Sequence, residues 1–346
     1  LIYQVADNGR LYQKYLGKKL NHDSDIQYLP QGTEAYLTHG MEDYFEPAIH
    51  IRHNDNNSSL LLKYVDHSSN AIDNGVNETV ITLKDDKYPV TVKLHYVAYG
   101  KENIIRTFTE ISHEEKKPVI LCKYASSMLH LNSSKYFLTE FSGDWAHEAN
   151  VTERELAFGK KVIDTKLGAR ANMFVSPFFQ LALDNPSQEN AGEVLVGTIG
   201  WTGNFRFTFE VDNKNELRII SGINPYDSEY SLPAKEVFRT PDFYFTYSTQ
   251  GKGEASRNFH DWARNHQVKN GNDTRMTLLN NWESTYFDFD ENKLIGLMDE
   301  ATKLGVDMFL LDDGWFANKY PRSSDHQGLG DWEAVSYTHL TLPTIC

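Results

Sequence analysis

Residues 306–316 read Val-Asp-Met-Phe-Leu-Leu-Asp-Asp-Gly-Trp-Phe, an apolar run that ends in two adjacent aspartates, a glycine and a tryptophan. A second short apolar run, Thr-Leu-Leu, lies upstream at 277–279. Between them, residues 291–304 repeat apolar side chains at helical spacing, and Gly305 follows as a normal helix stop. Strand, helix and strand in this order, with apolar strands, predict a βαβ unit of a parallel sheet.

The chain before this unit has a different pattern. Residues 1 to about 252 contain short alternating or apolar runs separated by clusters of Asn, Asp and Gly; examples are 59–65, 78–83, 90–97 and 205–211. This spacing predicts a large antiparallel β-sandwich. Residues 254–268 then place Phe259, Trp262 and Ala263 at helical spacing, and the polar segment 269–275 predicts a boundary.

Composition and charge exclude several classes of protein. The 346 residues carry 34 Lys and Arg against 48 Asp and Glu, a net charge of −14, and no basic patch is evident, so we expect no nucleic acid and no membrane as partner. No apolar run approaches the roughly 18 residues of a membrane span. The two cysteines, Cys122 and Cys346, form no disulfide framework, which favours a reducing, cytoplasmic location.

The aspartate pair is the most informative chemical feature. Asp312 and Asp313 repel one another unless hydrogen-bond donors surround them, and sugar hydroxyls are suitable donors. A purely structural role, as a polar strand end with a packing Trp, is equally compatible with the spacing. A metal site is the weaker interpretation, because no His or third carboxylate is spaced to complete it.

Two further segments bear on a site. Asn280-Asn281-Trp282-Glu283 follows the preceding strand, on the edge where α/β barrels build their sites, although capping Asn residues would give the same pattern. Asp43 by composition is only part of an acidic turn. Trp145 and Trp201 are interpreted as core tryptophans beside turns.

Taken together, three stretches resemble the α-galactosidases of glycoside hydrolase family 36. They are Asn-Asn-Trp-Glu-Ser-Thr-Tyr-Phe-Asp-Phe (280–289), Leu-Leu-Asp-Asp-Gly-Trp-Phe (310–316) and Leu-Gly-Asp-Trp (329–332). Upstream, 46–49, 200–204 and 221–225 match the same family in order, and the bacterial, lactobacillus-like branch is the most similar in pattern.

The resemblance implies an N-terminal β-supersandwich followed by a catalytic (β/α)8 TIM barrel. It divides the chain into a supersandwich over 1–253, a helix and linker over 254–275, and the start of an incomplete barrel over 276–335. Residues 336–346 do not continue the family pattern, and we expect them to be a non-native tail. Only 70 residues follow Met276, whereas a barrel needs about 250, so we expect an N-terminal fragment truncated early in the barrel.

The resemblance also implies the function and the site residues. The family hydrolyses terminal α-linked galactose of melibiose and raffinose-type sugars with retention, by double displacement. Asp312, Asp313 and Trp282 match substrate-binding positions, and Asp43 matches a position that reaches a neighbouring subunit's site in tetrameric members. The catalytic nucleophile lies in a Lys-Trp-Asp motif that this sequence lacks, so we expect no catalytic residue here and an inactive piece.

Other functions stay open at this point. One is a non-catalytic galactoside-binding sandwich module, and another is a related family-36 α-N-acetylgalactosaminidase or transferase. We expect no cofactor and no metal, a small-molecule α-galactoside as substrate, and a homo-oligomeric, tetrameric full-length enzyme.

Overall fold

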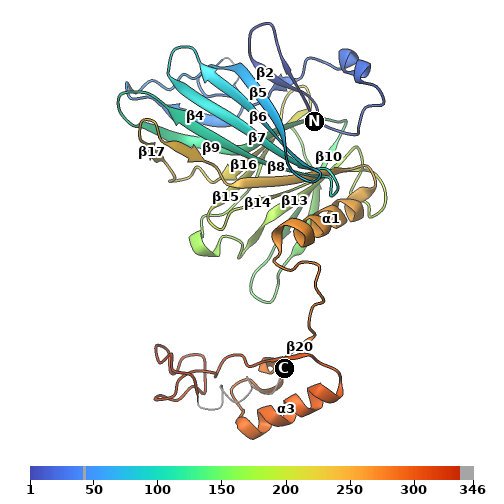
Figure 1. Ribbon diagram of the computed structural model, residues 1–346, viewed down its shortest axis with the longest axis vertical. Helices are drawn as coiled ribbons and strands as arrows, with labels where there is room; N and C mark the ends of the chain where they lie inside the picture. Colours follow the sequence, from blue (N-terminus) through green and yellow to red (C-terminus); the bar gives the residue numbers. More distant parts are fainter. Residues whose placement is uncertain (42–43, 336–346) are drawn as a thin grey trace. The chain divides into compact units, whose positions relative to one another are not determined.

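The computed structural model describes residues 1–41 and 44–335, and it divides the chain into two compact units (Figure 1). The first unit spans Leu1–Gly271 and the second Asn272–Cys346. Asp43 and the proposed tail, 336–346, lie outside the described residues.

A ten-stranded antiparallel sheet forms one layer of the first unit. Its strands follow the order β11-β10-β13-β14-β19-β8-β7-β6-β5, and β18 also pairs with β8. Their bounds are β5 (Leu62–Asp73), β6 (Val76–Asp85), β7 (Val90–Tyr99), β8 (Ile104–His113), β10 (Tyr136–Ser142), β11 (Asn150–Glu155), β13 (Val175–Leu183), β14 (Glu193–Gly200), β18 (Val237–Arg239) and β19 (Asp242–Ser248).

A six-stranded sheet forms the opposite layer, in the order β12-β15-β16-β9-β17, with β4 pairing with β9. Its strands are β4 (Ile49–Arg52), β9 (Val119–Asn132), β12 (Gly159–Asp164), β15 (Phe205–Val211), β16 (Glu216–Ile223) and β17 (Tyr230–Leu232). A small sheet of β1 (Ile2–Val5), β2 (Leu11–Tyr15) and β3 (Thr33–Glu34) and two short 3-10 helices, η1 (Asp23–Tyr28) and η2 (Gly168–Arg170), complete the unit apart from its C-terminal helix.

Two hydrophobic cores lie between the layers. The first joins β5–β8 to β4 and β9 through residues such as Leu83, Val92, Ile51 and Leu121. The second joins β10, β13, β14 and β19 to β12, β15 and β16, and its centre is aromatic: Phe179, Phe205, Phe207, Phe209, Phe243 and Phe245 are all buried there. The 14-residue strand β9 contributes to both cores, which makes the two halves of the sandwich one folding body.

The predicted helix packs onto the sandwich. Helix α1 (Gly251–Trp262) continues into a π-helical turn, η3 (Ala263–Gln267). Ala255 contacts Ala182, Val194 and Val196, while Trp262 packs against Ile104 and Tyr244. The unit boundary therefore falls after Gly271, and the helix belongs to the sandwich unit.

The second unit contains the predicted βαβ arrangement. Strands β20 (Leu278–Asn280) and β21 (Met308–Leu310) pair in parallel, with Leu279 opposite Phe309. Helix α3 (Glu291–Lys303) connects them, and the short helix α2 (Trp282–Thr285) precedes it. The Asp290 side chain caps α3 by accepting a hydrogen bond from the Lys293 amide, and Gly305 adopts a positive φ of 78° just past its end.

The fold predicted from the sequence, an antiparallel β-supersandwich followed by the first βαβ unit of a barrel, is confirmed. Two side-chain predictions were wrong: Trp145 is 84% exposed and Trp201 is 40% exposed. Trp145 lies in the turn between β10 and β11, and Trp201 follows β14 with its indole over Gly203. Short turns at a sheet end place a side chain beyond the layer that would cover it.

The aromatic core leads to a first prediction. Gly197 of β14 faces the rings of Phe179 and Phe243, and a Cβ added there would lie 2.6 and 2.7 Å from them. The substitution Gly197→Ala therefore overpacks the core, and we expect urea denaturation to show a loss of about 1–3 kcal/mol for the sandwich.

Gly296 on helix α3 is the matched control, because a Cβ there meets nothing within 4 Å. Gly296→Ala lies in the other unit and favours helix, so the sandwich transition stays unchanged. Equal effects of the two substitutions would contradict the packing argument.

Candidate functional site

Polar side chains follow both parallel strands of the second unit at the same edge. Asn280 ends β20, and it lies opposite Leu310, which ends β21. The Asn281 amide continues the ladder by donating to the Leu310 carbonyl at 3.3 Å. Because parallel strands point the same way, the residues after each strand meet at one edge of the sheet, which is where ligands bind in parallel α/β folds.

Asp312 is held by the segment that follows β20. The Asn280 Nδ2 donates to Asp312 Oδ2 at 2.6 Å, and the Asp312 amide donates to Asn281 Oδ1 at 2.8 Å. Asn281 is fully buried, and its Nδ2 donates to Thr285 Oγ1 at 3.0 Å. Asn280 therefore holds the carboxylate of Asp312 and Asn281 holds its backbone amide, so neither asparagine serves only as a helix cap.

Asp313 is held by an arginine from the following loop. Arg322 donates from Nε to Asp313 Oδ1 at 2.9 Å and from Nη2 to Oδ2 at 2.5 Å. The Gly314 amide adds a bond of 2.7 Å to Oδ1. The hydrogen bonds from Arg322 lower the pKa of the Asp313 carboxyl below its ordinary value, which keeps it ionised at neutral pH.

The turn after the pair requires a glycine. Gly314 has a φ of 92°, and a Cβ at this position would lie 2.7 Å from the ring of Phe289. This turn leads into Trp315, which is partly exposed, and Phe316, whose ring centroid lies 4.8 Å from that of Trp332. Gly314 thus gives the chain its sharp exit from the strand.

Trp282 belongs to the same cluster. It is half-buried at the start of α2, and its amide donates to Asn280 Oδ1 at 2.7 Å. Its ring meets Phe287 edge-on with centroids 4.9 Å apart, and the Arg322 guanidinium lies 5.4 Å from the centroid of Phe287. Three of the four predicted substrate-binding residues, Trp282, Asp312 and Asp313, therefore lie in one cluster. Trp282 is linked to Asp312 through Asn280 and to Asp313 through Phe287 and Arg322.

The sequence analysis missed Arg322. It assigned the hydrogen-bond donors that the aspartate pair needs to a substrate, whereas the protein supplies most of them itself. The available signal was a lone cation nine residues beyond Asp313 in the segment Pro321-Arg322-Ser323-Ser324-Asp325. A partly buried carboxylate pair requires such a partner when no substrate is bound.

Asp43 lies outside the described residues, but the residues that follow it are anchored to the sandwich. Glu46 pairs with Lys123 of β9 and with Lys160 of β12, the latter at 2.6 Å. Its amide donates to Glu210 Oε2 at 2.8 Å. Burial alone would raise the pKa of the Glu46 carboxyl, but Lys123 and Lys160 lower it to about 2. At Lys123, burial lowers the pKa of the ammonium group and pairing with Glu46 raises it. The effect of burial is the larger, so the pKa of Lys123 is lowered.

The three motifs of the sandwich unit, residues 46–49, 200–204 and 221–225, are connected through β9 and its neighbours. Strand β4, which begins at Ile49, pairs with one part of β9, and β16 pairs with another. Asn224 donates its amide to the Asn204 carbonyl at 2.9 Å and its Nδ2 to the Thr165 carbonyl at 2.9 Å. The motif residues therefore hold loops at the sandwich end by side-chain hydrogen bonds, which is a structural role.

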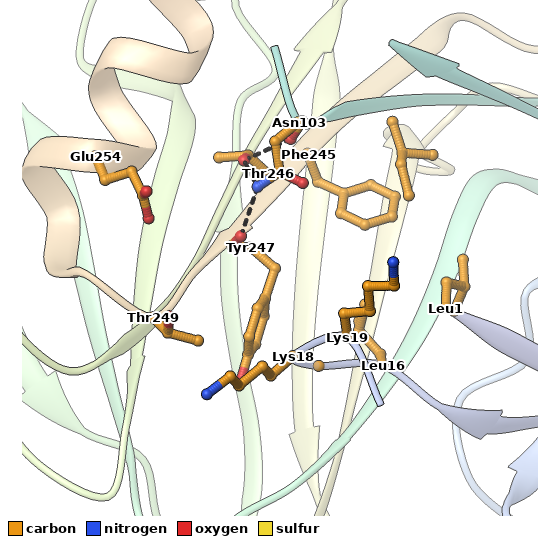
Figure 2. Close-up of a pocket in the computed structure, with 12 residues that line it drawn as sticks. Leu1, Leu16, Lys18, Lys19, Asn103, Phe245, Thr246, Tyr247, Thr249 and Glu254 are labelled. Atoms are coloured by element: carbon orange, nitrogen blue, oxygen red, sulfur yellow. Dashed lines mark hydrogen bonds between the residues drawn. The ribbon is translucent and has the colours of Figure 1, made fainter. Parts of the chain in front are cut away.

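A separate pocket of about 310 Å³ lies on the sandwich (Figure 2). Lys18 and Lys19 come from the segment after β2, Phe245 and Tyr247 from β19, and Glu254 from α1. Glu254 is the only carboxylate among its lining residues, and it accepts a hydrogen bond of 2.5 Å from Ser248. Burial, together with Glu193, raises the pKa of Tyr247 and keeps its phenol protonated. The aspartate pair is therefore the stronger candidate site.

Among residues 1–41 and 44–335, no three His, Cys, Asp or Glu side chains are grouped so that they would hold a metal ion. No helix in the described part of the chain is both long and apolar enough to cross a membrane.

Two family models match the chain. Residues 9–233 match the glycosyl hydrolase family 36 N-terminal domain, and residues 237–341 match melibiase. The α-galactosidase Mel36A of Lactobacillus acidophilus is 28% identical over 96% of this chain and 50% of its own length.

Two crystal structures of variants of the α-galactosidase AgaA from Geobacillus stearothermophilus are similar throughout the chain. The complex with 1-deoxygalactonojirimycin has a TM-score of 0.86 and the complex with raffinose one of 0.87. Both are 26% identical and cover 96% of this chain and 51% of theirs.

The sandwich and the βαβ unit that follows it correspond in order to the two matched domains. Because the N-terminal domain match alone covers more than half of the residues, the chain belongs to glycosyl hydrolase family 36. It spans about half the length of the curated relatives it matches.

The Glu46 anchor leads to a second prediction. Glu46→Gln removes the charge that offsets Lys123 and Lys160, and we expect a loss of about 2 kcal/mol in the free energy of unfolding at pH 7. A carboxyl whose pKa is about 2 when folded and about 4.3 when unfolded stabilises the fold above the unfolded value. The difference between wild type and variant therefore shrinks as pH falls from about 4.3 toward 2 in urea denaturation.

Glu229→Gln provides the matched control. Glu229 pairs with Arg52 at the surface, at 3.1 Å, so we expect a change within about 1 kcal/mol. A Glu46→Gln effect that is as small as this control, or that does not depend on pH, would show that Glu46 is not an anchor.

Proposed function

We propose that this chain is the N-terminal half of a retaining α-galactosidase that hydrolyses terminal α-linked galactose in melibiose and raffinose-type sugars. The family membership supports the reaction class. The observation that carries the proposal is the pair Asp312 and Asp313, held side by side just after β21 at the carboxyl edge of the parallel strand pair. Carboxylates in this position accept hydrogen bonds from sugar hydroxyls.

In this proposal the pair binds galactose and does not break the glycosidic bond. A retaining glycosidase needs a nucleophile and an acid/base carboxylate about 5 Å apart on opposite sides of the bond. Consecutive residues on one strand end cannot flank a bond in this way. The nucleophile and the acid/base, in our proposal, come from later strands of the barrel, and Trp282 lines the galactose pocket.

The mechanism then divides between two parts of the enzyme. Asp312, Asp313 and Trp282 orient the galactose ring so that its anomeric carbon faces the nucleophile. One aspartate of the complete barrel attacks the anomeric carbon while the second, as a carboxylic acid, protonates the departing glycosidic oxygen, so the aglycone alcohol leaves and a galactosyl ester forms. The second aspartate, now ionised, takes a proton from water, which attacks the anomeric carbon, releases the first carboxylate and gives galactose with net retention. Because the 346 residues supply only the orienting half, we propose that they are inactive by themselves.

We further propose that the complete enzyme is a cytoplasmic homo-oligomer, a tetramer in which Asp43 approaches the galactose site of a neighbouring subunit. The adjacent Tyr44 is almost fully exposed, and Glu46 is anchored to the sandwich. Few cysteines support the cytoplasmic location. Light scattering of the complete enzyme tests the oligomer, since a monomer would exclude this role for Asp43.

The decisive experiment uses the product of the complete reading frame that contains this sequence. We expect it to release p-nitrophenol from p-nitrophenyl α-galactoside but not from the α-N-acetylgalactosaminide. Asp312→Asn removes a charged acceptor of the substrate hydroxyls, and we expect kcat/KM to fall about 100-fold.

Asp299→Asn is the control, because Asp299 is exposed on helix α3 and lies away from the strand ends. It should keep wild-type kinetics. Release of p-nitrophenol by the 346-residue chain alone would contradict the division of labour, and absence of α-galactosidase activity in the complete product would contradict the proposed function.

A further inference from the structure

The Arg322 guanidinium makes three kinds of contact: an ion pair with a carboxylate, hydrogen bonds to backbone carbonyls, and contacts with aromatic rings. Its side chain is only 8% exposed, although it lies in a loop. Nε and Nη2 donate to the two oxygens of Asp313, a bidentate geometry that is available to Arg and not to Lys. One face of the pair is therefore rigid in both distance and orientation.

The remaining nitrogen of Arg322 shapes its own loop. Nη1 donates to the carbonyls of Ser324, Asp325 and Gln327, at 3.3, 3.2 and 2.6 Å. The guanidinium also lies 4.7 Å from the ring centroid of Phe316, which follows β21, and 5.4 Å from that of Phe287, which follows β20. Arg322 thus joins the two strand-end segments and the loop at a single charged group.

The two carboxylates also differ in how many hydrogen bonds they can still accept. An ionised carboxylate has about four acceptor positions. Protein donors occupy two on Asp312, from Asn280 and from the Asp313 amide. They occupy three on Asp313, two from Arg322 and one from the Gly314 amide. About two positions on Asp312 and about one on Asp313 are left for substrate hydroxyls.

We propose that Arg322 is a positioning residue for galactose binding, which fixes the Asp313 carboxylate by its bidentate bond and leaves Asp312 as the main anionic acceptor of the site. This inference rests on the proposed function. It predicts that the geometry of the arginine, rather than its charge alone, sets the affinity for the sugar, because a single point charge would let Asp313 rotate.

The test compares Arg322→Ala and Arg322→Lys in the complete enzyme. Two quantities are measured: KM and kcat for p-nitrophenyl α-galactoside, and Kd for 1-deoxygalactonojirimycin by calorimetry. We expect both variants to raise KM and Kd about 10- to 100-fold, with Lys close to Ala, because both lose the bidentate bond. Guanidinium ion at millimolar concentration should recover part of the affinity of Arg322→Ala, and ammonium ion should not.

Lys319→Ala is the matched control, because it removes an exposed cation from the same loop and should leave Kd unchanged. A merely structural role would lower the melting temperature or the active fraction while KM and Kd stay at wild-type values, and this result would overturn the inference. Wild-type affinity in Arg322→Lys would overturn it too, because charge alone would then suffice.

Circular dichroism identifies a variant that does not fold, in which case Arg322→Lys carries the test. Failure of the proposed function is a different result: the wild-type complete enzyme would then lack α-galactosidase activity. An active wild type with unaffected Arg322 variants would reject only the role of Arg322.

Discussion

The carboxylates of the consecutive residues Asp312 and Asp313 repel one another. Hydrogen-bond donors from the surrounding segments of the second unit offset this repulsion. The bidentate bond from Arg322 neutralises Asp313, and the side chain of Asn280 together with backbone amides takes up part of the charge on Asp312. In a partly buried position such donors are obligatory, since an unpaired carboxylate would lose its hydration without compensation. The loop after Phe316, the turn at Gly314 and the ends of both strands follow from this requirement.

In the first unit, strand β9 has the corresponding role. It pairs with β4 and β17 in one half and with β16 in the other, and its side chains enter both hydrophobic cores. Motifs that are about 150 residues apart in sequence, around Glu46 and around Asn204, are therefore connected through one strand and its neighbours. The polar residues of these motifs bond neighbouring segments to one another. In this unit, therefore, a distinctive polar motif marks a loop that is held by side-chain interactions.

The sequence was sufficient where the pattern depends on local periodicity. The alternating runs predicted β6, β7 and β15, the apolar spacing predicted α1 and α3, and the order of the elements predicted that the polar residues after β20 and β21 meet at one edge. Each of these signals depends on residues within one element and on the rule that parallel strands end together.

The sequence was insufficient where a contact joins distant elements. Arg322 reaches Asp313 because a loop folds back, and the cation in that polar segment does not by itself show to which carboxylate the loop returns. The exposure of Trp145 and Trp201 depends on how far their turns project beyond the sheet, which an apolar side chain does not encode. The same limit applies to the donors of Asp312, whose asparagines equally resemble helix caps.

In our proposal, Asp312 and Asp313, held by Arg322, form the galactose-binding group of the enzyme. A crystal structure of the complete protein with 1-deoxygalactonojirimycin tests this most directly. We expect hydroxyls of the iminosugar within hydrogen-bond distance of both carboxylates, more of them on Asp312, with the Arg322–Asp313 bidentate bond intact. An iminosugar bound away from this edge, or an Asp313 that leaves Arg322 to reach the ligand, would contradict it.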